Sequence, residues 1–217
     1  KKLPFKITFN CTTRVDLLDD DLIKAMKDAG LAQISVGIES GSAEILKQTD
    51  KDITHEQILK AAEMLNRHHI FWTGYFMIGL PTETEEDINK TIAFLNKAKP
   101  YYAGLGVYNP FPRTKLFTQG VNMGLLDPEP PLEHFLKTNP KDLFFKDPQQ
   151  RLLNISHDKF QQLAETASEK FHRHNSNIFN LIRRGFARRR AYMYDPSLLK
   201  RDFGRGLEFL GLGSLIK

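Results

Sequence analysis

One short stretch of the sequence places ligand-binding groups at the end of a predicted strand. In ISVGIESGSAEIL, residues 34–46, an apolar strand pattern ends at Glu39, and Ser40, Gly41 and Ser42 precede a helical pattern. Backbone N–H groups and hydroxyls near a helix N-terminus bind polar and anionic groups, and a carboxylate accepts hydrogen bonds from a diol such as a ribose. The alternative is that Glu39 only caps the helix. The residue types alone leave both interpretations open.

Strand and helix patterns alternate around this stretch. Strand patterns cover residues 5–11, 31–39, 70–81 and 102–112. Helical patterns lie between them at residues 16–30, 54–69 and 82–100. This order favours parallel strands joined by right-handed crossovers, and the lack of a glycine-rich phosphate turn after the first strand argues against a doubly wound sheet. We therefore expect an α/β fold that is part of a TIM-like (β/α) barrel, because a closed barrel needs eight strands.

Beyond residue 119 the pattern changes. We expect residues 1–119 to form the barrel portion, residues 120–150 an irregular connection with several prolines, and residues 151–217 a helical C-terminal extension. In the extension, Ser156 caps one predicted helix and Pro196 opens the last one. The net charge of +5 has its excess here, in IRRGFARRR at residues 182–190. We interpret this run as a solvated helix face, because no aromatic platform or known nucleic-acid module accompanies it.

Composition limits the classes of protein that fit. With 41% apolar and 26% charged residues, the chain has a globular rather than a disordered or collagen-like profile. No apolar run is long enough to span a bilayer and no leader pattern opens the sequence, so we expect a cytoplasmic protein. The single cysteine, Cys11, excludes an internal disulfide and a metal site made of several thiolates of this chain. Because the first residue is Lys1 and not Met, we expect a piece of a longer polypeptide.

The predicted strand ends together carry a family resemblance. NCTTRVD, ISVGIESGSAEILKQTDK, GYFMIGLPTET and VYNPFP resemble, in order and spacing, the second half of the radical S-adenosylmethionine (SAM) enzymes. The similarity is greatest to the group with an N-terminal cobalamin-binding domain, often labelled Mg-protoporphyrin IX monomethyl ester oxidative cyclase or Fe–S oxidoreductase. The methylthiotransferases are further away. The resemblance covers about residues 5–117 and extends more weakly into the helical extension.

The resemblance implies a radical mechanism in a longer parent. In that family a CxxxCxxC motif holds a [4Fe–4S] cluster on three of its irons, SAM chelates the fourth, and an electron cleaves SAM to a 5′-deoxyadenosyl radical. The motif is absent from this sequence. The chain therefore resembles a segment that begins near the third barrel strand and is inactive alone, with no catalytic residue and no metal ligand of its own. The missing N-terminal half of the polypeptide would supply the cluster and, in this group, cobalamin.

The resemblance also assigns binding roles to strand ends. Glu39 matches the acidic or amide residue that bonds the ribose hydroxyls of SAM, with Ser40 beside it. Lys51 matches a basic residue that reaches the methionine carboxylate through a charge-assisted bond, and the alternative is one more solvated lysine. The strand end that packs against adenine in the family is matched by Met77, Ile78 and Gly79. The alternative for that strand end is ordinary barrel core.

Two further strand ends complete the predicted site. The stretch that closes the adenine pocket in the family is matched by Asn109, Pro110 and Phe111. The family usually has a glycine where this sequence has Arg113, which predicts an altered loop backbone. Arg14, at the end of the first strand, is a candidate for binding an acidic substrate or the SAM carboxylate. A helix-entry ion pair with Asp16 or Asp19 is the alternative for Arg14.

Two hypotheses from other classes stay open. In the first, the chain is a catalytically empty scaffold whose exposed barrel edge forms a dimer, because an exposed edge strand must be covered. In the second, the arginine-rich helix binds RNA with a steep salt dependence, although we regard a nucleic-acid partner as the weaker hypothesis. With the radical SAM interpretation, the expected partners are the N-terminal half and a small-molecule substrate. The family label implies a tetrapyrrole substrate, which the residues themselves do not identify.

Overall fold

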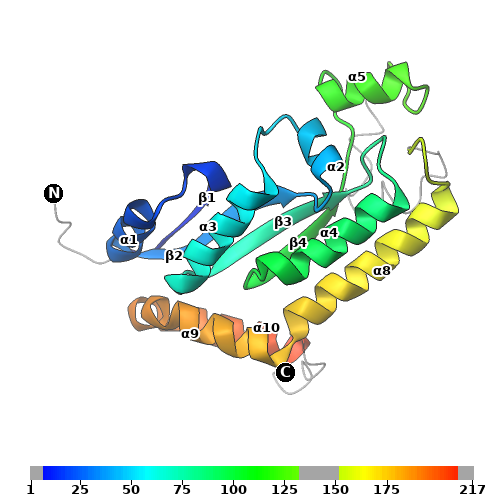
Figure 1. Cartoon of the computed structure of the whole chain (residues 1–217). Helices are drawn as coiled ribbons and strands as arrows, with labels where there is room; N and C mark the ends of the chain where they lie inside the picture. Colours follow the sequence, from blue (N-terminus) through cyan, green and yellow to red (C-terminus); the bar gives the residue numbers. More distant parts are fainter. Residues whose placement is uncertain (1–6, 132–151, 210–217) are drawn as a thin grey trace.

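The centre of the molecule is a parallel four-stranded sheet whose order in space, β1-β2-β3-β4, follows the order in the sequence. In the computed structural model, residues 7–131 and 152–209 are described (Figure 1). The strands are β1 (Phe9–Thr13), β2 (Leu31–Glu39), β3 (Trp72–Ile78) and β4 (Tyr102–Val107). Since sequential strands are neighbours, successive crossovers run in one direction and their helices cover one face. This arrangement confirms the predicted α/β fold and partial TIM-like barrel.

The outer face of the sheet carries the hydrophobic core. Ile34 of β2 lies beside Trp72 of β3 in register, so both side chains point to the same side. The crossover helices that cover this side are α1 (Asp20–Ala29), α3 (His55–Arg67) and α4 (Glu85–Ala98). Ile34 and Trp72 are at most 1% exposed. Because each such side chain contributes about 1.5–3 kcal/mol when fully buried, this interface holds the sheet and helices together.

The inner face of the sheet is polar by contrast. Ser35 lies beside Thr73 in register, and Thr73 lies beside Tyr102, so side chains of the inner face share one surface. Gln33 Nε2 donates to Thr73 Oγ1 at 3.2 Å on the same surface. Tyr75, two residues further along β3, is 48% exposed. In a barrel this face is the interior, so it is the face that encloses a ligand.

Local capping explains where the helices begin and end. Thr54 and Gln57 form a reciprocal capping box at the start of α3, and Thr84 and Asp87 form another at the start of α4. Gly30 ends α1 in the left-handed region, with φ 109°. The cap at Gly30 and the box at Thr54 lie at bounds of the helices predicted at residues 16–30 and 54–69.

Several predicted element boundaries differ from the observed ones. The helix predicted from residue 16 is interrupted: a 3-10 turn, η1 (Val15–Leu17), precedes α1, and Asp19 caps α1 through Leu22 N at 2.7 Å. Two short helices follow strand ends, α2 (Ala43–Gln48) and α5 (Lys115–Asn122). The predicted boundary at residue 119 falls inside α5. Most of the predicted irregular connection, residues 132–150, lies outside the described residues.

The C-terminal helices pack directly on the sheet. They are α8 (His157–Ser176), α9 (Ile178–Tyr194) and α10 (Pro196–Phe209), and Ser156 caps α8 as predicted. Asn175 of α8 bonds both backbone groups of Ala103 in β4, accepting from N at 2.9 Å and donating to O at 2.8 Å. The ring centroids of Phe171 and Phe76 lie 5.0 Å apart. Figure 1 shows α8 beside α4, with α9 crossing below the sheet. The helical extension is therefore part of the same packed structure.

No helix in the described ranges has both the length and the apolar character needed to cross a bilayer.

Candidate functional site

The carboxyl end of β2 places an acidic and a basic side chain together. Glu39 Oε1 and Lys51 Nζ form an ion pair, with side-chain exposures of 15% and 36%. Glu39 has a left-handed φ of 64°, and the β2–β3 register shifts between Gly37 and Glu39. Such a bulge redirects a strand-end side chain, at a strain of about 1 kcal/mol for a non-glycine residue. A Cβ at Gly37 would lie 2.3 Å from Glu39 Oε1, so this glycine makes room for the pair.

Arg14 lies beside this pair, but Asp16 already neutralises its charge. The Arg14 Nε and Nη2 atoms each lie 3.0 Å from an oxygen of Asp16, and Nη2 also donates to the backbone oxygen of Lys51. The Asp16 carboxylate holds the pKa of Arg14 above its usual value. The structure therefore contains the helix-entry ion pair that was the alternative for Arg14, and places Arg14 next to Lys51 as well.

The Ser40-Gly41-Ser42 turn joins α2 to α4. The Ser40 hydroxyl is buried, lies 3.0 Å from Thr91 Oγ1 and accepts from Ser42 N at 3.1 Å. The Ser42 hydroxyl donates to Asp87 Oδ1 at 2.6 Å. A Cβ at Gly41 would lie 2.3 Å from Lys90 O, so only glycine permits this approach. The serine side chains thus hold the turn against α4, and the carboxylate of Asp87 already faces the start of α2.

At the carboxyl end of β3, the backbone is more available to a ligand than most of the side chains are. Ile78 is fully buried in the outer core, and its carbonyl accepts from Tyr108 N at 2.7 Å. Met77 is half-buried and packs with Leu80 and Tyr108. Gly79 follows with a φ of 88°, a left-handed conformation that favours glycine. A ligand at this strand end would contact Met77 and the backbone around Gly79.

Glu83 is a buried acid at the same strand end that the sequence interpretation missed. Its Oε2 accepts from Gly79 N at 2.5 Å and from Leu80 N at 3.2 Å, whereas its Oε1 is buried without a hydrogen-bond partner. Burial raises the pKa of Glu83 to about 8, against the lowering effect of the two N–H groups. Its position among the acids of TETEED, which are typical of a helix start, concealed it.

The end of β4 supplies the last predicted residues. Pro110 is buried and Phe111 is 56% exposed, and Asn109 Oδ1 is buried without a hydrogen-bond partner. Arg113 has a φ of 69°, the left-handed conformation that glycine favours. The loop therefore adopts a glycine-like backbone at Arg113 in spite of the substitution. Nearby, Lys115 Nζ pairs with Asp50 Oδ2 at 2.6 Å, which links α5 to the segment that carries Lys51.

The described residues do not fit an iron–sulfur cluster. Cys11 is the single cysteine of the sequence, and it packs partly buried against the outer core. Burial raises the pKa of the Cys11 thiol, which disfavours the thiolate that binds iron. Within residues 7–131 and 152–209, no group of three or more His, Cys, Asp or Glu side chains is arranged to hold a metal ion. A cluster would need ligands from outside these residues.

The arginine-rich helix α9 is not the solvated face that the sequence predicted. Arg183 stacks over Tyr101 at 4.6 Å and Arg188 over Phe71 at 4.6 Å, and Arg188 is only 6% exposed. Arg184 Nε donates to Tyr101 O at 2.5 Å, and burial lowers the pKa of Arg184 to about 10. The prediction holds for the exposed Arg189 and Arg190. The other three guanidinium groups attach α9 to the amino end of the sheet and are engaged there instead of facing solvent.

Comparisons with known proteins agree with the strand-end pattern. The model of the "Radical SAM superfamily" matches residues 1–95. An uncharacterized methyltransferase of Pyrococcus horikoshii is 29% identical over 76% of this chain and 34% of its own length. The anaerobic magnesium-protoporphyrin IX monomethyl ester cyclase of Cereibacter sphaeroides is 32% identical over 54% of this chain and 19% of its own. The chain thus spans about a fifth to a third of these relatives.

A solved structure shares the fold. Coproporphyrinogen III oxidase (HemN) from Escherichia coli, described as a radical SAM enzyme, superposes with a TM-score of 0.50 at 15% identity. The match covers 75% of this chain and 32% of that one. At this identity the likeness supports the partial barrel alone. The match of the family model confirms, over residues 1–95, the resemblance to the radical SAM superfamily that was seen in the sequence.

Proposed function

We propose that the full-length protein is a radical SAM enzyme and that this chain binds SAM at the carboxyl ends of β2, β3 and β4. The observation that carries the proposal is the Glu39–Lys51 pair at the end of β2, within a chain whose first 95 residues match the superfamily. When bound, SAM would supply a carbon radical for hydrogen abstraction, with an electron from a cluster held outside the described residues.

The polar groups of the site are suited to a ligand that carries both a diol and an amino acid. One Glu39 oxygen contacts Lys51, and the other is the candidate acceptor for ribose hydroxyls. Lys51 has further donors beyond the one that meets Glu39, and an ammonium is a charge-assisted partner for a carboxylate. Glu39 thus orients the lysine that would bind the methionine carboxylate. The glycine at position 37 keeps this region free of a third side chain.

The apolar groups would bind adenine. Met77 lies at the end of β3 on the side opposite the fully buried Ile78, and Gly79 leaves the following backbone without a side chain. Asn109 and Pro110 follow the adjacent strand β4, with a buried and unpartnered amide oxygen on Asn109. An adenine needs flat apolar contacts and amide or backbone partners for its edge. These residues offer both, and we keep Ser40 as a support of the turn.

The reaction of the whole protein stays open. The cyclase and methyltransferase names of the relatives make an oxidative cyclisation or a cobalamin-linked methyl transfer the two candidate reactions. Cobalamin, a tetrapyrrole substrate and the inactivity of the isolated chain are predictions from the sequence resemblance. We propose that the remaining polypeptide supplies the cluster ligands, because the described residues do not fit that role.

The experiment uses the full-length protein, purified anaerobically and reconstituted with iron and sulfide. We would measure SAM affinity and the dithionite-dependent release of 5′-deoxyadenosine. Replacing Glu39→Ala removes the ribose acceptor and should weaken SAM binding by about ten- to a hundredfold. Glu39→Gln retains an acceptor and should lose much less. Glu44→Ala, on a 77% exposed side chain five residues away, is the matched control and should be unchanged.

Equal SAM affinity in wild type and Glu39→Ala would remove Glu39 from the site while leaving the radical reaction possible. Failure of the reconstituted wild type to release 5′-deoxyadenosine would reject the enzyme proposal itself. In that case the scaffold hypothesis, tested by concentration-dependent dimerisation, would be the better account.

A further inference from the structure

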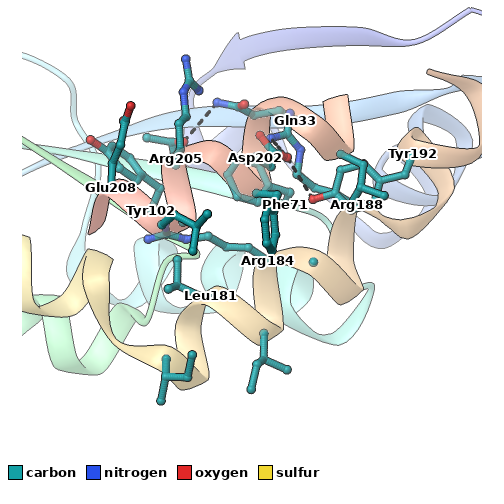
Figure 2. A pocket seen from close by; sticks show the side chains of 18 of the residues that line it. Gln33, Phe71, Tyr102, Leu181, Arg184, Arg188, Tyr192, Asp202, Arg205 and Glu208 are labelled. Carbon is teal, nitrogen blue, oxygen red and sulfur yellow. Dashed lines mark hydrogen bonds and ion pairs between the residues drawn. The ribbon is translucent and has the colours of Figure 1, made fainter. Parts of the chain in front are cut away.

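A cavity of about 830 Å³ lies at the amino end of the sheet, opposite the end that carries Glu39 and Lys51. It is formed between the inner face of the sheet and helices α9 and α10 (Figure 2). Its sheet wall includes Gln33, Phe71, Thr73 and Tyr102, which lie near the amino ends of β2, β3 and β4. We propose that this cavity is a binding site for a small molecule with an apolar, ring-containing body and one anionic group. Neither the sequence resemblance nor the proposed SAM site involves these residues.

The cavity has the size and lining of a ligand site. A volume of about 830 Å³ falls within the range of about 300–1,000 Å³ that is usual for small-molecule pockets. Aromatic and aliphatic side chains dominate the lining, among them Phe71, Tyr102, Leu199 and Phe203. Leu199 and Phe203 are 52% and 67% exposed, so two lining residues leave apolar surface uncovered. An apolar ligand body would cover it.

The polar groups of the cavity point to an anion. Arg188 is 6% exposed, and its Nε is buried without a hydrogen-bond partner. Its Nη1 pairs with Asp202 Oδ2 at 2.6 Å, and Tyr192 Oη donates to the same oxygen at 2.9 Å, as the dashed lines in Figure 2 mark. The one buried carboxylate of the lining is therefore already satisfied. An unpaired N–H on a buried cation favours a ligand acceptor with negative charge.

Arg205 adds a second positive charge to the lining from α10. It is exposed, and it forms no ion pair within the part of the chain that the structure describes, although Glu208 lies three residues further on the same helix. Arg184 lines the cavity too, but it is engaged by Tyr101 and Asn175. The lining therefore holds three arginines, Arg184, Arg188 and Arg205, against two acids, Asp202 and Glu208, which leaves an excess of one positive charge.

Two helical glycines keep the cavity open. Gly185 of α9 and Gly206 of α10 both line it, and a Cβ built on either would meet no atom within 4 Å. Glycine inside a helix destabilises it relative to alanine. Neither the local backbone nor close packing accounts for glycine at these positions. The open space at both lining positions provides a way to fill the site without a clash.

The test measures binding of two fluorescent probes to the full-length protein. 8-Anilinonaphthalene-1-sulfonate has two ring systems and one anionic group, and N-phenyl-1-naphthylamine has the same rings without the charge. We expect the anionic probe to bind with a stoichiometry of one and the neutral probe to bind at least about tenfold more weakly, as expected for the loss of charge-assisted bonds. Because no SAM chemistry is involved, this result is independent of the proposed function.

Three variants locate the probe. Gly185→Leu with Gly206→Leu fills the cavity and should abolish binding, while thermal unfolding shows that the protein is folded. Lys200→Leu puts the same side chain on exposed α10 surface outside the lining and should bind as wild type. Arg205→Gln should weaken the anionic probe severalfold and leave the neutral probe unchanged.

Two results would overturn the proposal. Probe binding that survives the double leucine variant, or that is absent from the wild type, would show that this cavity is not a ligand site; absence is the result expected if other parts of the polypeptide cover it. Equal affinity for both probes, unchanged by Arg205→Gln, would reject the anionic ligand class.

Discussion

The two ends of the sheet differ in how their charges are used. At the carboxyl end, the charged groups are paired with one another: Glu39 with Lys51, Arg14 with Asp16, and Lys115 with Asp50. At the amino end, arginines stack on aromatic rings and bond backbone oxygens, and Arg188 pairs with Asp202 through Nη1 but keeps an unpaired Nε. The members of an ion pair at the strand ends can exchange partners and bind a ligand that carries both positive and negative groups. A buried cation with an unpaired N–H suits a ligand of one sign.

The largest expected effect on the free energy of unfolding concerns Glu83, at the carboxyl end of the sheet. Its pKa of about 8 in the fold lies above the ordinary value of 4.5, so Glu83 favours folding while it is protonated. The stability it contributes is complete below about pH 4.5 and is lost as pH rises through about 8. Glu83→Gln mimics the protonated acid. We expect the variant to match wild type at pH 4 and to exceed it by about 5 kcal/mol at pH 9.

Denaturant unfolding at a series of pH values measures this difference. Glu85→Gln, on the half-exposed neighbouring side chain, is the control and should leave the pH dependence of wild type intact. Parallel stability curves for wild type and Glu83→Gln across this pH range would contradict the buried, protonated state of Glu83.

The second effect tests the amino end through Asn175. Asn175→Ala leaves the N–H and the C=O of Ala103 buried without partners, at about 1–3 kcal/mol each. We expect a loss of about 3 kcal/mol in the free energy of unfolding, measured by chemical denaturation. Asn154→Ala removes one exposed bond, from Nδ2 to Thr82 O, and should cost less than about 1 kcal/mol. If the two variants were equally stable, α8 would not be an integral part of the sheet packing.

The sequence predicted the parts of this fold that depend on neighbouring residues. The end of α1 near Gly30, the start of α3 near Thr54 and the bounds of β2 follow from signals within a few positions, and the structure contains them. The pairing of Glu39 with Lys51 brings together a strand-end residue that the local pattern had singled out and a loop residue that only the family resemblance had singled out.

The sequence did not predict which charged side chains are buried or which distant residues they contact. Glu83 sits in a row of acids typical of a helix start, yet it turns inward to bond Gly79 N and Leu80 N. Arg188 sits in a row of arginines, yet Phe71, more than a hundred positions away in the sequence, determines its place. In both cases the residue type suggests solvent, and a tertiary contact that no local pattern encodes decides otherwise.

The third effect on stability compares the two ends of the sheet directly, through alanine substitutions of one glycine at each end. A Cβ at Gly41 would lie 2.3 Å from Lys90 O and 2.7 Å from Phe94 Cβ, so Gly41→Ala should destabilise the fold by about 2 kcal/mol. At Gly185 a Cβ meets no atom within 4 Å, so Gly185→Ala should stabilise it by about 0.5–1 kcal/mol. Opposite shifts of the denaturation midpoint would establish that the turn at the carboxyl end is tightly packed and the cavity at the amino end is open. Shifts of the same sign would contradict this comparison.

The smallest effect concerns the loop after β4. Arg113 holds a φ of 69°, which costs a residue with a Cβ about 1 kcal/mol relative to glycine. Arg113→Gly should therefore raise the stability by up to about 1 kcal/mol, and Arg113→Ala, which keeps the Cβ but loses the guanidinium, should leave it nearly unchanged. A higher denaturation midpoint in the glycine variant alone assigns the difference to the backbone. If both variants behaved alike, the side chain and not the left-handed conformation would be the reason that arginine occupies this position.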